Sequence, residues 1–449
     1  MSTIEKHDMT QGKILLPLVS FTIPLVLGNL FQLTYNAADS VIVGKYVGEQ
    51  ALAAVGTSTP IMNIAILLIS GMCMGASVLM SSQYGAKDYD TLSRQISTTM
   101  LAGCGFSVVF SLLMLLLANP VLRLIRVPET AIPEAAAYLR IIFMGLIFTF
   151  MYNFLANTMR ALGDSKTPLY FLVTSAFLNI FGDLFFVVVL RWGVAGSAIA
   201  TVFSEGLCCL LCGIYIKKKI PLLCLGKKWW VFDKSLLGKT VSYGSTSAMQ
   251  QVCLQLGKLI IQSVVNTQGV AVMAAFTVVN RVDDFAYTPQ QNIGHAMTTF
   301  LAQNKGAGHK ERMKKGFQTG LLIELVYSIG LFCVIWGLAP QIMTLFAEDG
   351  DAQVVSLGIS YLHLISWMYI LPGLTNGVQG FFRGIGDLKV TLYSTFMNMF
   401  GRVVAVFVMI RLLQMEFASL AWANMVGWIV MLLFEVPLLV KSMRNGECG

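Results

Sequence analysis

Two aspartates lie inside long apolar stretches of this chain of 449 residues, where a charge is unexpected. Asp39 comes six residues before Lys45, and Asp183 comes eight residues before Arg191. At 1.5 Å per helical residue they would lie roughly 9 Å and 12 Å below the ends of their segments, at a similar depth. A charge at the centre of a bilayer costs about 2.5 to 3.5 kcal/mol, so acids placed there generally have a function. Carboxylates in such surroundings can hold a proton or a monovalent cation.

Two further polar residues share this depth. Asn179 is one helical turn before Asp183 on the same face, and Thr201 enters on the next apolar segment. Together with Asp39 they form a candidate coupling-ion site for H⁺ or for Na⁺, with Asp39, Asn179 and Asp183 as the sodium ligands. No other metal site and no cofactor is expected, because most of the nine cysteines lie in apolar runs without polar ligand partners.

Two polar stripes follow single faces of predicted helices. Helical spacing of three and four residues relates Asn29, Gln32, Asn36 and Asp39 in the first stripe, and Gln251, Gln255, Lys258, Gln262 and Asn266 in the second. Lipid cannot satisfy these groups, so the stripes are predicted to line a shared aqueous cavity that binds substrate. The alternative is that the amides form hydrogen bonds between packed helices.

The composition explains why these segments are read as membrane spans. Hydrophobic residues make up 56% of the chain and charged residues 12%, whereas soluble domains are roughly 25% charged. Apolar segments of about 20 residues match the hydrocarbon thickness of a bilayer. The prediction is an all-α polytopic membrane protein with helices over residues 13–43, 51–83, 94–118, 132–159, 168–190, 194–216, 236–266, 270–303, 316–338, 352–382, 390–410 and 416–440.

The basic residues predict the orientation of these spans. With the N-terminus inside, 22 lysines and arginines fall at cytoplasmic positions and five at outer positions, as the positive-inside rule requires. Both termini are therefore expected in the cytoplasm, and no cleavable signal peptide is expected before residue 13. The formal charge of +8 follows from the same bias, so we expect no nucleic-acid partner.

An internal repeat divides the chain. The segment RALGDSKTPLY from Arg160 matches RGIGDLKVTLY from Arg383 at six of eleven positions, and each half holds six predicted helices. An even number of helices makes the repeats parallel, a pattern typical of transporters with a site at the repeat interface; a duplication without transport is the alternative. The glycine is expected to permit a tight turn, across which Arg160 could pair with Asp164. The predicted organisation is a cytoplasmic segment 1–12, an N-terminal lobe 13–216, a linker 217–235, a C-terminal lobe 236–440 and a cytoplasmic tail 441–449, with the lobes around a central cavity.

The second half does not copy the charges of the first. Asn398 matches Asn179, but Arg402 stands where Asp183 stands. Lys258 and Arg281 add positive charge, and Asp283, Asp284 and Glu324 are candidate partners that would neutralise it. Asn398 and Arg402 are therefore expected to belong to the substrate cavity rather than to a cation site.

The segments NAADSVIVGKYVGEQALAAVG, RALGDSKTP, LNIFGD and GVAGSAIAT resemble the MATE (multidrug and toxic compound extrusion) antiporters, in their DinF-like prokaryotic branch. The resemblance covers residues 13 to 440. It implies two six-helix lobes and export of amphiphilic compounds driven by sodium or protons. It also implies that Asp39, Asn179, Asp183 and Thr201 form a polar network, to which Tyr138 and Asn153 belong. Lys258 departs from the branch that carries an acid on its seventh helix.

The function expected from these observations is cation-coupled antiport, with amphiphilic and mainly cationic small molecules as cargo. The expected protein is a monomer in the cell membrane. The alternative within transport is a flippase for lipid-linked or anionic lipid-like substrates, which the basic residues of the second half would suit. An intramembrane enzyme is not expected, because the sequence lacks an HExxH or nucleophile motif.

Overall fold

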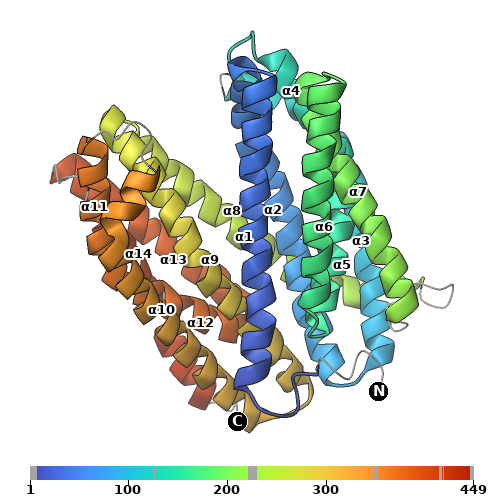
Figure 1. Cartoon of the computed structure of the whole chain (residues 1–449). Helices are drawn as coiled ribbons and strands as arrows, with labels where there is room; N and C mark the ends of the chain where they lie inside the picture. Colours follow the sequence, from blue (N-terminus) through green and yellow to red (C-terminus); the bar gives the residue numbers. More distant parts are fainter. Residues whose placement is uncertain are drawn as a thin grey trace. The chain divides into compact units, whose positions relative to one another are not determined.

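The computed structural model describes residues 8–125, 127–220, 230–346, 352–413, 417 and 419–444. All regular structure in this part of the chain is helical. Helices α1 to α7 and the π-helical segment η2 cover the first half (Figure 1). Their bounds are α1 Leu15–Tyr46, α2 Glu49–Gly85, α3 Tyr89–Leu124, α4 Ile132–Met144, α5 Leu146–Ala161, α6 Lys166–Asp183, η2 Leu184–Val189 and α7 Gly193–Lys219.

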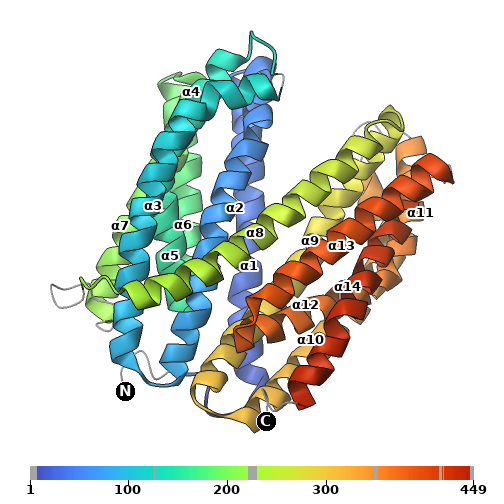
Figure 2. The ribbon, with the colours of Figure 1, turned by 180° about the vertical axis from the view of Figure 1, so that it is seen from behind.

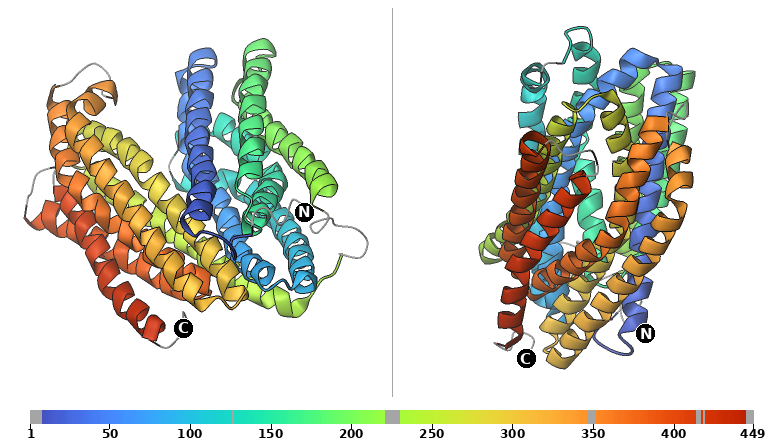
Figure 3. Two further views of the ribbon diagram at one scale, coloured as in Figure 1. Left: turned by 60° about the horizontal axis from the view of Figure 1, so that its bottom comes forward. Right: turned by 90° about the vertical axis from the view of Figure 1, so that its left-hand side faces the viewer.

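The second half repeats this pattern. Helices α9, α10, α12, α13 and α14 pack against one another as a bundle (Figure 3). The bounds are α8 Lys234–Val265, α9 Val270–Gly306, α10 Lys310–Phe346, α11 Ala352–Ser366, η6 Trp367–Tyr369, α12 Ile370–Ile385, α13 Leu388–Phe407, η7 Val408–Leu412 and α14 Ser419–Arg444.

The polytopic all-α prediction is confirmed. Among the described residues, nine helices are long and apolar enough to cross a membrane, and the bent pair α4 and α5 makes a tenth span. The other two predicted spans, α8 and α9, are helices of 32 and 37 residues, about 48 Å and 55 Å long. They fall short in hydropathy and not in length, because the second polar stripe runs along α8 and charged residues occur on α9.

Two helices that the sequence predicts as continuous are broken. Residues 132–159 divide at Gly145 into α4 and α5, which are bent by 47°; a Cβ atom at Gly145 would lie 2.4 Å from Val202 of α7. Residues 352–382 divide at the 3₁₀ turn η6. Pro372 follows this turn and lacks the N–H that would bond the carbonyl of Met368. Breaks of this kind release backbone groups for other partners.

The repeated RxxGD loops turn through glycine, as predicted. Gly163 has φ of 88° and Gly386 has φ of 86°, a left-handed conformation that side chains disfavour. The pairing of Arg160 with Asp164 is not found among the described residues. The Asp164 carboxylate instead accepts hydrogen bonds from the backbone N–H groups of Lys166 and Thr167, because it lies where it can cap the start of α6.

The described residues form two compact units that differ from the predicted lobes at their edges. The first contains Asp8 and Ile23–Ala248, and the second contains Met9–Thr22 and the described residues from Met249 on. The expected division fell at residues 217–235, whereas the contacts divide the chain inside α8, a single unbroken helix (Figure 2).

The first half of α8 belongs to the first unit because it packs closely on α2 and α3. A Cβ atom at Gly71 would lie 2.6 Å from the backbone of Ala248. At the start of α8, Asp233 forms an ion pair with Arg94 at 2.5 Å. The side-chain amide of Gln95 also donates to the Thr240 hydroxyl at 2.5 Å. Small residues permit this close contact between helix backbones within a membrane.

The segment Met9–Thr22 is held in the second unit through its backbone. The Arg312 guanidinium donates hydrogen bonds to the carbonyls of Met9, Gln11 and Gly12. The Met9 N–H donates to Gln303. Five donors make arginine well suited to collecting carbonyl groups in this way.

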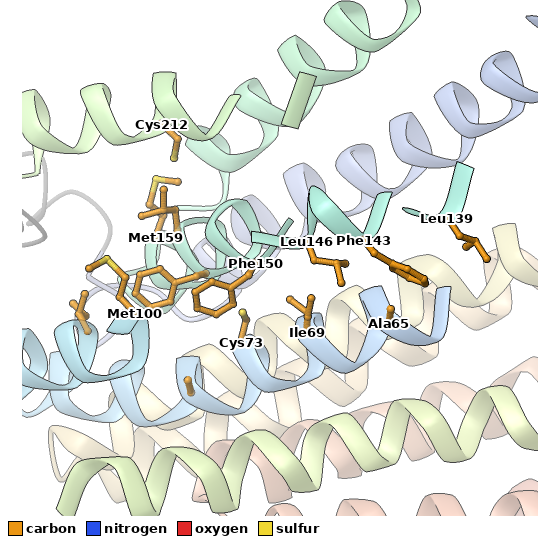
Figure 4. Close-up of a cluster of buried hydrophobic side chains, with 14 of the residues drawn as sticks. Ala65, Ile69, Cys73, Met100, Leu139, Phe143, Leu146, Phe150, Met159 and Cys212 are labelled. Atoms are coloured by element: carbon orange, nitrogen blue, oxygen red, sulfur yellow. The ribbon is translucent and has the colours of Figure 1, made fainter. Parts of the chain in front are cut away.

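The core of the first unit is a cluster of buried apolar side chains from α2, α3, α4, α5 and α7 (Figure 4). Phe143, Leu146 and Phe150 lie on the two sides of the α4/α5 break and face Ile69 and Cys73 of α2. Packing on both sides of the break fixes the bend, and with it the position of Tyr138 on α4.

Candidate functional site

The first-unit acids are brought together by α1, α6 and α7. Asp39 lies on α1 and is partly buried, and the Ser197 hydroxyl of α7 donates a hydrogen bond to its Oδ1 at 2.7 Å. Asp183 is the last residue of α6. The two carboxyl groups are close enough to interact directly. The two acids that the sequence predicts at a similar depth are therefore also neighbours in the fold.

Asp183 is fully buried, with 0% of its surface exposed. Neither carboxylate oxygen has a hydrogen-bond donor among the described residues. The π-helical segment η2 begins at the next residue, a feature that often marks functional sites. An ionised carboxylate in this position is costly unless a proton or cation accompanies it.

The neighbouring amide adds another unpaired oxygen. Asn179, which is 3% exposed, donates from Nδ2 to the Thr201 hydroxyl at 3.1 Å. Its Oδ1 atom has no donor in the described part of the chain. A Cβ atom on Gly182 would lie 3.0 Å from that of Ala200, so α6 and α7 approach closely here. Oxygen atoms without donors are the ligands that a proton or a hard monovalent cation requires.

Tyr138 also belongs to this site. It is 3% exposed, interacts electrostatically with both Asp39 and Asp183, and donates its hydroxyl to the Met62 sulfur at 3.7 Å. Five sequence-predicted residues therefore meet, namely Asp39, Tyr138, Asn179, Asp183 and Thr201. Ser197 was missed, although it lies one turn before Thr201 on the same helical face.

A third acid of the first unit has a donor. The Thr149 hydroxyl donates to Glu205 Oε2 at 2.5 Å, and the amide of Asn153 donates to the Thr149 carbonyl at 2.9 Å. The Asn153 amide is therefore bonded within its own helix, to the residue whose hydroxyl contacts Glu205. Tyr35 of α1 interacts electrostatically with both Glu205 and Asp39.

The first polar stripe is only partly embedded. Asn29 is half-buried and Gln32 is exposed, while Gln32 forms a side-chain interaction with Tyr35. The side chain of Asn36 lies outside the described residues. The stripe therefore has an exposed side chain at Gln32 and ends at Asp39, one member of the carboxyl pair.

The second stripe contains both accessible groups and groups bonded to protein. Gln251 and Gln255 are half-buried. Lys258 forms an ion pair with Asp284 of α9 at 3.3 Å, with both side chains 53% exposed. Gln262 donates at 2.7 Å to Asn266, the residue that follows the end of α8.

The amide that bonds helices together is one residue outside the predicted stripe. Gln250 is 3% exposed and donates to the Thr395 hydroxyl at 3.0 Å and to Gln379 at 3.2 Å. Hydrogen bonding between packed helices was the alternative considered for the whole stripe, and Gln250 is the neighbouring amide that forms such bonds.

Asp283 is the acid that the second unit surrounds with donors. It is 4% exposed and accepts hydrogen bonds from the hydroxyls of Tyr361 at 3.1 Å and Tyr369 at 2.5 Å. Arg402 interacts with it electrostatically, and Asn424 donates to the Tyr361 hydroxyl at 2.9 Å. Asn398 is buried nearby, with its carbonyl facing Gly427. Lys258 has one of the predicted acidic partners, Asp284. Neither Arg281 nor Arg402 forms an ion pair among the described residues, although Arg402 interacts electrostatically with Asp283.

Known proteins share this arrangement of helices. The family model MatE matches residues 24–185 and 247–409, which are the two repeats. The probable multidrug resistance protein YpnP of Bacillus subtilis is 32% identical over 392 residues, covering 87% of this chain and 86% of the relative. The probable multidrug resistance protein NorM of Thermotoga maritima is 23% identical and covers 92% of this chain and 89% of the relative.

Solved structures support the same fold. A MOP superfamily transporter from Pyrococcus furiosus superposes with a TM-score of 0.91 at 21% identity, covering 99% of each chain. A structure described as MATE in the bent conformation gives a TM-score of 0.91 at 21% identity, covering 100% of both chains. With both repeats matched by the family model and a relative above 30% identity, this chain belongs to the MatE (MATE) family of membrane transporters.

Proposed function

We propose that this protein is a cation-coupled antiporter of the cell membrane that exports amphiphilic, mainly cationic organic compounds by alternating access. Relatives named as multidrug resistance proteins support the class of cargo. The observation that carries the coupling is the Asp39 and Asp183 pair, in which the buried Asp183 carboxyl lacks a donor among the described residues.

The pair can act as an occupancy switch. Two neighbouring carboxylates repel each other, and one shared proton or sodium ion removes that repulsion. Bound cation also lowers the local negative charge, so a cationic substrate is held less tightly. Antiport needs this differential affinity, because each ligand must favour a different state of the protein.

The polar residues outside the pair are proposed to bind cargo. Amides supply hydrogen bonds that tolerate varied compounds, and Tyr138 offers an aromatic face to cations. The proposed substrate residues are Asn29, Gln32, Asn36, Tyr138, Asn153, Gln251, Gln255, Lys258, Gln262, Asn398 and Arg402.

Efflux by the purified protein in lipid vesicles, with a proton or a sodium gradient imposed alone, tests the proposal. Asp183→Asn and Asp39→Asn keep size and hydrogen bonding but remove the charge, so each should lower gradient-driven efflux by about 100-fold, near the upper range of coupling energies. The exposed acid Asp90 supplies a control, and Asp90→Asn should transport normally. Wild-type efflux in both site variants under either gradient would show that coupling occurs elsewhere.

Export of an anionic lipid is the weaker candidate. One of the basic residues that favoured it is already paired, since Lys258 binds Asp284. A paired cation attracts an anionic headgroup much less than a free one. Flipping of a fluorescent anionic lipid in the same vesicles, without any drug efflux, would favour this candidate instead.

The orientation remains a prediction from the basic residues, with both termini and the connection between α7 and α8 in the cytoplasm. Single cysteines introduced at Lys217 and Lys234 should react with an impermeant reagent only from the cytoplasmic side. Labelling from outside alone would invert the topology.

A further inference from the structure

The second unit contains a buried acid that the proposed mechanism does not use. Glu324 on α10 is 1% exposed, and neither of its carboxylate oxygens has a hydrogen-bond donor among the described residues. Glu324 takes part in none of the three ion pairs found among the described residues. An ionised carboxylate buried without a partner costs several kcal/mol, so this group requires a neutralising ligand.

The side chains around Glu324 provide further oxygens and have committed their donors elsewhere. Gln290 of α9, which is 0% exposed, donates from Nε2 to the Ser328 hydroxyl at 3.1 Å and to the Tyr369 carbonyl at 2.8 Å. The Gln290 Oε1 atom has no donor in the described structure. Ser328, one turn after Glu324, donates to the Glu324 backbone carbonyl at 2.7 Å.

These groups converge over a glycine. A Cβ atom built on Gly373 of α12 would lie 2.8 Å from Ser328 Oγ, 3.3 Å from Gln290 Nε2 and 3.5 Å from Glu324 Oε2. The three polar heads therefore meet at one point, and glycine is the residue that leaves space there.

The break in the tenth span supplies one more ligand. Tyr369 lies in the η6 turn, and its carbonyl accepts a hydrogen bond from Gln290 Nε2 at 2.8 Å. Its hydroxyl donates to Asp283. One residue therefore contacts both the Glu324 cluster and the Asp283 cluster, so a change at Glu324 could be transmitted to Asp283 through the turn.

The charged and titratable residues near Glu324 do not neutralise its carboxylate. Tyr327 on α10 interacts with it electrostatically, but its hydroxyl donates to the Ala286 carbonyl. On the packed elements, Asp283 of α9 and Tyr369 of η6 bond to each other. His295 of α9 faces Arg383 of α12, and the ring of His363 of α11 packs at a tilt against Trp336.

We propose that Glu324, Gln290 and Ser328, with the Tyr369 carbonyl, form a second monovalent-cation site that holds a proton or a sodium ion within the second unit. Carboxylate, amide, hydroxyl and carbonyl oxygens are ligands suited to a hard cation. The site shares no residue with the Asp39 and Asp183 pair, so the protein would bind two coupling cations.

The test uses the purified full-length protein in lipid nanodiscs, with Glu324→Gln and Asp183→Asn studied separately. Binding of radioactive sodium is measured at alkaline pH, and infrared difference spectra between acidic and alkaline pH are recorded without sodium. If sodium is the ligand, Glu324→Gln loses one bound sodium per protein and Asp183→Asn loses the other. If the proton is the ligand, Glu324→Gln keeps its sodium but loses one protonated-carboxyl band that titrates in the wild type.

Two results would overturn the site: a Glu324→Gln variant with unchanged sodium binding and an unchanged infrared spectrum, or a Glu324 band that never titrates in the folded protein. The Asp183→Asn arm reports on the first unit alone, so the proposed function and this inference can fail separately.

A steric variant covers the case in which Glu324→Gln does not fold. Gly373→Ala leaves every charge in place but puts a methyl group among the polar heads, so binding at this site should weaken by at least about tenfold. Gly330→Ala on α10 is the matched control, because a Cβ atom there has no neighbour within 4 Å. Equal binding by both alanine variants would contradict the site.

Discussion

Asp183 in the first unit and Asp283 in the second are both buried acids, and they differ in what surrounds them. Asp283 accepts hydrogen bonds from two tyrosine hydroxyls and interacts electrostatically with Arg402. Asp183 has no donor among the described residues and lies beside another carboxyl group. A satisfied carboxylate holds its surroundings in one arrangement, whereas an unsatisfied one requires a ligand that can come and go.

The repeat makes this contrast informative. Asn179 and Asn398 occupy matching positions, and the helices that carry them, α6 and α13, each continue into a π-helical turn, η2 and η7. The backbone framework is therefore shared, while the charge pattern is not. The same framework holds two neighbouring carboxyl groups in the first unit and a hydrogen-bonded acid in the second.

The largest expected effect is on stability in the second unit. Asp283→Ala removes the acceptor of two buried tyrosine hydroxyls, so it should destabilise the protein by about 3 kcal/mol. Asp183→Asn should cost less than about 1 kcal/mol, because no donor loses its acceptor. Unfolding of both variants in mixed detergent measures the difference. Equal losses would remove the distinction between the two acids.

An intermediate effect is expected from separating α6 and α7. A Cβ atom built on Gly182 would lie only 3.0 Å from the Cβ atom of Ala200, so Gly182→Leu should force the two helices apart. This would move Asn179 and Asp183 of α6 away from Thr201 and Ser197 of α7. Gradient-driven efflux should fall by about tenfold, equivalent to 1.4 kcal/mol. Gly213→Leu on α7 is the control, because a Cβ atom there meets nothing within 4 Å. If both variants transport alike, the α6 and α7 contact does not position the ion site.

The smallest expected effect is at the exposed ion pair. Lys258→Ala should change stability by less than about 1 kcal/mol, because pairs exposed to this degree contribute little. It leaves Asp284 unpaired, so the ratio of transport rates for cationic and neutral substrates should rise. Asp284→Asn should shift the ratio in the opposite direction. A Lys258→Ala variant that fails to accumulate, yet keeps its selectivity, would identify the pair as structural.

The sequence predicted the helical spans well because their main signal is local. Apolar segments of membrane length and the repeat at Arg160 and Arg383 are visible without any contact information. The breaks at Gly145 and before Pro372 were missed. Glycine and proline occur within several other helices of this chain without breaking them, so the local sequence does not predict where a helix breaks.

For the candidate site, the sequence by itself identified Asp39 and Asp183 as two acids at a similar predicted depth within apolar helices. It did not determine which acids find donors. Ser197 and Asp39 are 158 residues apart, and Tyr369 and Asp283 are 86 residues apart, so these partners depend on which helices pack together. Glu324 was predicted to neutralise a base and instead has no partner among the described residues. Only the tertiary structure decides this, because hydrogen bonds and ion pairs act over a few ångströms, while helical periodicity fixes only the face and depth of a side chain.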